Sequence, residues 1–80
     1  MIYVLSSEID YAGAYPVSAD DSLIPIVEKA RETDGDSLLI QVFQNGKCAH
    51  WCRFDGIKRE RITYETVLAN LKPYKGTLSD

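Results

Sequence analysis

The segment Cys48-Ala49-His50-Trp51-Cys52 contains both cysteines and the single histidine of the chain, the residue types that supply nucleophiles and metal ligands. In an extended strand Cys48 and Cys52 lie roughly 13 Å apart, because each residue adds about 3.3 Å. A disulfide needs Cα atoms within about 7 Å, and two ligands of one zinc ion lie similarly close. The spacing therefore predicts two reduced thiols, buried as small hydrophobic residues, and no metal site.

A cysteine–histidine nucleophile is the second chemistry that this segment allows, because His50 would share a strand face with both thiols and could activate one. The sequence positions no carboxylate to orient the imidazole, since the expected cross-strand neighbour of His50 is Gln41. Motifs for phosphate loops, dinucleotide binding, EF-hands, zinc proteases and serine hydrolases are absent. We therefore predict no catalytic residues, no cofactor and no enzymatic activity, and keep a thiol enzyme as an alternative.

The strand that carries these residues belongs to the clearest local pattern of the chain, a hairpin over 37–43 and 47–54. Asn45-Gly46 between the strands tolerates the positive φ angles of a tight type I′ turn, which would place Ala49 opposite Val42. One face would then carry Leu38, Ile40, Val42, Ala49 and Trp51. The other would carry Leu39, Gln41, Phe43, Cys48, His50, Cys52 and Phe54. Both faces are substantially apolar, so each should be covered.

Two helices are expected to flank this hairpin. The first begins at a cap, Asp21 or Ser22, and Gly35 suits the left-handed position after its last turn. Its buried face would consist of Leu23, Ile26, Val27 and Ala30. The second begins at the cap Thr63 and stops before Pro73. Its buried face would consist of Val67, Leu68 and Leu71.

The N-terminal residues predict another hairpin. Alternation over residues 1–5 indicates a strand, and residues 14–18 return as an edge strand because Pro16 cannot donate a hydrogen bond. The predicted fold is a small α+β domain with a mainly antiparallel sheet of two hairpins and two helices, in the order β-β-α-β-β-α. One domain covers residues 1–80, with 73–80 as a polar C-terminal tail.

Size and composition narrow the class of protein. The chain has 80 residues, 45% of them hydrophobic and 26% charged, which is ordinary globular usage. No apolar run approaches the ~18 residues that cross a bilayer, and the N-terminus lacks the basic and apolar regions of a signal peptide. With two cysteines that cannot pair along one strand, these features predict a cytoplasmic protein without membrane contact.

The chain is acidic overall, with a net charge of −3 and a pI near 5.0, although its first half holds most of the acidic side chains and its second half most of the basic ones. The densest basic run, Lys58-Arg59-Glu60-Arg61, is interrupted by a glutamate. Nucleic-acid binding usually requires a basic domain, so we expect a solvated connector here and no nucleic-acid partner.

A partner-binding surface is expected where the second helix, about two turns long, leaves one hairpin face incompletely covered. That face would present aromatic anchors beside the basic connector, an arrangement that gives affinity at the centre and steering at the rim. The residues of this predicted surface are Phe43, His50, Phe54, Lys58, Arg59 and Arg61. An acidic loop adds Glu8, Asp10 and Tyr11.

These observations predict a small non-enzymatic protein-binding module. In size and acidic character the chain is similar to the small inhibitors that phages and mobile elements make against host defence proteins, anti-CRISPR proteins among them; the similarity covers no motif. Two alternatives stay open. One is a structural or regulatory protein that homodimerises through the spare sheet face, and the other is a nucleic-acid-binding accessory protein that uses residues 58–61.

Overall fold

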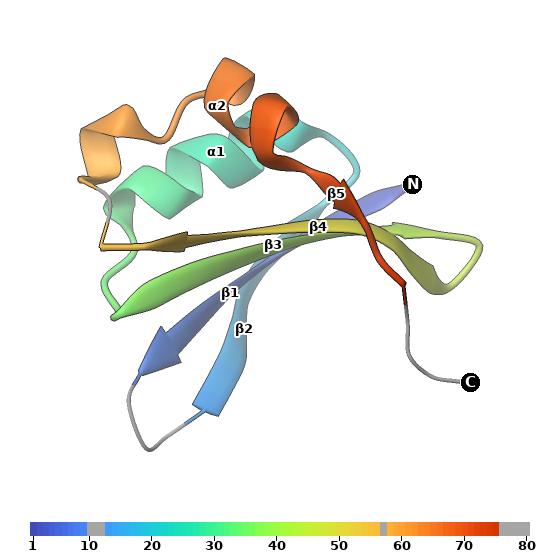
Figure 1. Ribbon diagram of the computed structural model, residues 1–80, viewed down its shortest axis with the longest axis horizontal. Helices are drawn as coiled ribbons and strands as arrows, with labels where there is room; N and C mark the ends of the chain where they lie inside the picture. The colour runs from blue at the N-terminus through green and yellow to red at the C-terminus, as the bar shows by residue number, and fades with distance from the viewer. Residues whose placement is uncertain (10–12, 57, 76–80) are drawn as a thin grey trace.

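The computed structural model describes residues 1–9, 13–56 and 58–75, which contain both helices and sheet (Figure 1). The order of the elements is β-β-α-β-β-α-β, which confirms the predicted order and adds a short last strand. The elements are β1 (Ile2–Ile9), β2 (Gly13–Asp20), α1 (Leu23–Glu32), β3 (Ser37–Gln44), β4 (Lys47–Asp55), the 3₁₀ turn η1 (Arg59–Arg61), α2 (Tyr64–Asn70) and β5 (Lys72–Pro73).

The five strands form one antiparallel sheet in the order β2-β1-β3-β4-β5. Both helices pack on the same side of it (Figure 1). The core between helices and sheet contains Leu5, Leu23, Ile26, Val27, Ala30, Leu38, Ile40, Cys52, Phe54, Ile62 and Val67. The predicted buried face of the first helix is therefore confirmed. The expectation that the second helix partly covers the opposite sheet face is wrong, because α2 lies beside α1.

The hairpin of β3 and β4 has the predicted turn but not the predicted register. Asn45 and Gly46 both have positive φ, at 53° and 78°. Beyond Phe43–Cys48 the pairing shifts by one residue, so that Val42 pairs with His50 and Ala49 is left as the extra residue of a β-bulge. Because neighbouring residues in a strand alternate between faces, the bulge exchanges the faces of every residue after Ala49. Phe54 consequently lies in the core and Trp51 on the helix-free side.

The first helix begins after Ser22, whose N–H donates to Oδ1 of Asp20 at 2.9 Å, and ends at Glu32. Gly35 lies beyond the residue that follows the helix, so its predicted role as the cap is wrong. Its φ of 145° is positive, and a Cβ there would collide with Oγ of Ser7. Since that hydroxyl donates to the Asp34 carbonyl at 2.7 Å, glycine is required by the close approach of β1.

The C-terminal part also departs from the prediction in one respect. Oγ1 of Thr63 accepts from the N–H of Thr66 at 3.1 Å, which confirms the predicted cap of α2. Pro73, however, pairs with His50, and the N–H of Tyr74 donates to the Ala49 carbonyl at 2.9 Å. The predicted tail therefore begins later than residue 73. No helix in the described residues is long and apolar enough to span a bilayer.

Candidate functional site

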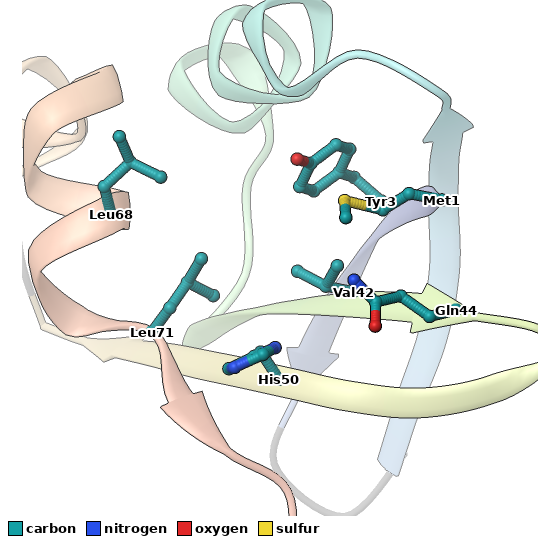
Figure 2. A pocket seen from close by; sticks show the side chains of 7 residues that line it. All are labelled: Met1, Tyr3, Val42, Gln44, His50, Leu68 and Leu71. Carbon is teal, nitrogen blue, oxygen red and sulfur yellow. The ribbon is translucent and has the colours of Figure 1, made fainter.

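An open pocket of about 350 Å³ lies on the helix side of the sheet, between α2 and the N-terminal end of β1 (Figure 2). Its lining side chains converge from β1 and the residue before it, from β3 and β4, and from α2 and the residue after it, and the figure shows them facing a common space. The lining residues are Met1, Tyr3, Val42, Gln44, His50, Leu68 and Leu71. A space of this size lies at the lower end of the range for ligand pockets, about 300–1,000 Å³.

The pairing register of the sheet brings Tyr3, Val42 and His50 together. Tyr3 pairs with Val42, and Val42 pairs with His50, so the three residues form one row across β1, β3 and β4 on the helix side. Without the bulge at Ala49, His50 would point to the other face. The end of α2 supplies the opposite wall through Leu68 and Leu71 (Figure 2).

Burial differs between the floor and the rim of the pocket. Val42 on the floor is 3% exposed, whereas Met1 and Leu68 at the rim are 60% and 47% exposed. Three lining residues can form hydrogen bonds, through the Tyr3 hydroxyl, the Gln44 amide and the His50 imidazole. Among the described residues no carboxylate, lysine or arginine side chain lines the pocket. The site is therefore suited to an uncharged, mainly apolar group with at most a few polar atoms.

The Cys48 thiol and the imidazole of the pocket lie on opposite sides of the sheet, whereas Cys52 lies on the same side as His50 and is buried in the core. Cys48 pairs with Phe43 on the helix-free side; its Sγ lies 3.5 Å from the backbone oxygen of His50 and 3.9 Å from the amide nitrogen of Gln41. Burial raises the pKa of Cys48, and the hydrogen bond from Gln41 opposes this only in part. Burial also raises the pKa of Cys52 to about 11. Both thiols are thus held in the protonated, weakly nucleophilic form at neutral pH.

The predicted aromatic patch of Phe43, His50 and Phe54 is not one surface. His50 lines the pocket, Phe54 is 5% exposed within the core, and Phe43 lies on the helix-free side. The physical reason is the bulge, which the turn sequence does not encode. Trp51 takes the place beside Phe43 that was assigned to the other two.

The basic residues of the connector, within residues 58–61, have two different roles, one structural and one at the surface. Arg59 donates from Nε to the Thr33 carbonyl at 2.7 Å and from an Nη nitrogen to the Gly35 carbonyl at 2.9 Å, so its guanidinium fixes η1 against the end of α1. The partner-binding role predicted for Arg59 stays a prediction, although its guanidinium also makes these two structural bonds. Lys58 and Arg61 are exposed and remain available.

The predicted acidic loop is described only in part. Oε1 of Glu8 lies 2.9 Å from Nε of Arg53; that oxygen is shielded from solvent and makes no hydrogen bond of good geometry, so the ion pair is its partner. Asp10 and Tyr11 lie outside the described residues.

Sequence reasoning missed most of the pocket. No sequence pattern indicates a site at Met1, Tyr3 or Gln44, and Leu68, which the helical pattern predicts to be buried, is half-exposed. The apolar residues Leu68 and Leu71 at the end of the second helix were the one local signal, and Leu71 is half-buried against the core.

Neither metal-ligand geometry in the described residues nor similarity to other proteins indicates a further role for this site. The described part of the chain contains no group of three or more His, Cys, Asp or Glu residues that could hold a metal ion. Comparison with protein-family models, with curated proteins and with solved structures finds no match to this chain.

Proposed function

We propose that this chain is a small non-enzymatic protein-binding module whose pocket receives an apolar side chain of a partner protein. The observation that carries the proposal is the open pocket on the helix side, with its apolar floor, three polar groups and exposed apolar rim. Interfaces derive much of their affinity from a few anchors that fill such depressions while surrounding contacts exclude water.

The rim favours a protein over a small ligand. Met1 and Leu68 are both about half exposed or more, and a small molecule seated on Val42 would leave their outer surfaces in water. A protein surface can cover the rim and fill the pocket in the same event, which adds apolar burial at about 25 cal/mol per Å². A partner anchor with a leucine, methionine or aromatic side chain fits this chemistry.

The finer proposal is that the partner is a host defence protein in the cytoplasm and that binding inhibits it by occupancy, as anti-CRISPR proteins do. Its support is the small acidic character of the chain, with 80 residues and a net charge of −3. Expression of the chain should restore phage plating on a host strain that carries the sensitive defence system. Equal plating with the wild type and with Leu68→Arg would contradict inhibition through the pocket.

The proposed function is tested by quantitative affinity capture with three forms of the chain: wild type, Leu68→Arg and Ala69→Arg. The first substitution places a charge over the pocket, and the second places the same charge on an exposed neighbour of the same helix that does not line it. The partner should be recovered equally by wild type and Ala69→Arg, and at least about ten-fold less by Leu68→Arg, which corresponds to a loss of about 1.4 kcal/mol. Recovery of no protein, or equal recovery by all three, would contradict the proposal.

A further inference from the structure

The polar side chains of the pocket have no hydrogen-bond partner in the protein. Within the described residues, the Tyr3 hydroxyl, the Gln44 amide and the His50 imidazole form no hydrogen bond with another protein group. Tyr3 and His50 are half-buried, and Gln44 is exposed. A purely apolar anchor that fills the pocket would take water from these groups and replace none of its hydrogen bonds, which is unfavourable. The best anchor therefore carries a polar atom of its own.

Gln44 and His50 are placed to bind one polar atom together. Val42 pairs with His50, and Gln44 follows Val42 by two residues on β3, so it faces the same side of the sheet. Diagonal neighbours on paired strands are typically about 7–8 Å apart, within reach of long side chains. Figure 2 shows the Gln44 amide turned back toward Val42, the cross-strand partner of His50. A polar atom above Val42 can therefore meet both groups.

The remaining surface of the pocket suits an aromatic ring. Val42 forms an apolar floor, and Leu68 and Leu71 form one wall. Tyr3 stands across the open space from Leu68 (Figure 2), and two aromatic rings attract each other in offset or edge-to-face arrangements. Met1 adds a thioether, which also contacts aromatic rings favourably. A ring gains from both of these contacts, whereas a leucine side chain gains only apolar burial.

We propose that the anchor is a tyrosine of the partner protein, with its ring between Tyr3 and Leu68 and its hydroxyl bonded to Gln44 and His50. This inference rests on the proposed function, because it names the side chain that the partner inserts. A phenol hydroxyl donates one hydrogen bond and accepts others, so it can pair with an amide and an imidazole at once. Phenylalanine leaves both groups unpaired, and the indole N–H of tryptophan only donates and so satisfies one.

Capped amino acids test the anchor without the partner. The probes are N-acetyltyrosinamide and N-acetylphenylalaninamide, which differ by one hydroxyl, added up to about 10 mM because molecules of this size bind weakly. Methyl NMR shifts of Leu68, Leu71 and Val42 report binding in the pocket. The tyrosine probe should bind at least about ten-fold more tightly, although it is the less apolar of the two, because only its hydroxyl pairs with the polar groups. Equal affinities, tighter binding of the phenylalanine probe, or no shift with either probe would overturn the proposal.

Variants assign the preference for tyrosine to the two polar groups. Gln44→Met and His50→Leu each replace a polar side chain by an apolar one, and each should reduce the preference to less than about three-fold by weakening the tyrosine probe alone. The control Gln41→Met makes the same change on the helix-free side and should keep the full preference. A preference that survives both pocket variants would contradict the hydrogen bonds proposed here.

The results also separate this inference from the proposed function. If affinity capture loses the partner with Leu68→Arg while the probes show no preference, the partner uses another anchor and only the tyrosine assignment fails. If the probes show the preference while wild type, Leu68→Arg and Ala69→Arg capture the partner equally, the partner binds elsewhere. The proposed function then fails, and the partner tyrosine fails with it.

Discussion

His50 and Cys48 are two positions apart in one strand, yet they lie on opposite sides of the sheet because Ala49 is inserted between them as a bulge. The imidazole lines the pocket, and the thiol lies on the helix-free face. In a regular strand the two side chains would have stood on one face. A single unpaired residue therefore separates the Cys48 thiol from the imidazole.

Thiol reactivity follows from burial. With a pKa near 11, Cys52 is ionised in only about one molecule per thousand at pH 8, and Cys48 also has a raised pKa. Because the thiolate is the reactive form, a raised pKa slows alkylation at neutral pH. In a labelling time course at pH 8 the half-buried Cys48 should react slowly and Cys52 only on unfolding. Labelling of Cys52 in the folded protein as fast as in urea would contradict its burial.

The backbone conformation at Gly35 disfavours any residue with a side chain. Chemical denaturation can measure the loss of stability when a side chain is added there. Gly35→Ala adds a side chain at positive φ and against Ser7 Oγ, so we expect a loss of at least about 2 kcal/mol in unfolding free energy. Gly46→Ala is the control, since its φ of 78° is also positive but its Cβ would meet open space. It should cost only about 1 kcal/mol. Equal losses would show that the contact with Ser7 has no effect.

Among the elements, the connector between β4 and α2 is tied to the end of α1 by the Arg59 side chain. The guanidinium of Arg59 bonds two backbone carbonyls after α1, whereas Arg61 is exposed. Arg59→Ala should therefore lower the unfolding free energy by about 1–2 kcal/mol, because it leaves these carbonyls without their donor. Arg61→Ala should change it by less than about 0.5 kcal/mol. Thermal melts of the two variants that coincide would contradict a structural role for Arg59.

Elements that depend on neighbouring residues could be predicted from the sequence. Features that depend on contacts between distant residues could not. The turn at Asn45-Gly46, the helical face that includes Leu23 and Ile26, and the cap Thr63 depend on neighbouring residues, so the sequence shows them directly. The bulge at Ala49 does not alter the alternation of residue types, because both hairpin faces are apolar. The packing of Cys52 and Phe54 into the core stabilises the bulge, and no local sequence pattern indicates this packing.

The candidate site was the least predictable feature for the same reason. Its walls come from β1, β3, β4 and α2, and their meeting depends on the sheet order and on α2 docking beside α1. His50 was identified as a binding residue, but its neighbours Tyr3 and Leu68 lie far from it in the chain. The two-residue strand β5 escaped prediction because Pro73 indicates only a helix end.

On the scale of the whole molecule, the sheet separates two surfaces with different chemistry. The helix side has an uncharged pocket with an apolar rim, and the helix-free side presents half-buried apolar side chains beside the ion pairs of Arg53 with Glu8 and Asp55.

The most direct test of the pocket as the partner site is methyl NMR of the chain during titration with its purified captured partner. Signals of Leu68, Leu71 and Val42 should shift or broaden, because these side chains line the pocket. Methyl signals of Leu39 and Val4, which lie on the helix-free face, should keep their positions at constant chain concentration. Shifts confined to Leu39 and Val4, with the pocket signals unchanged, would contradict the account.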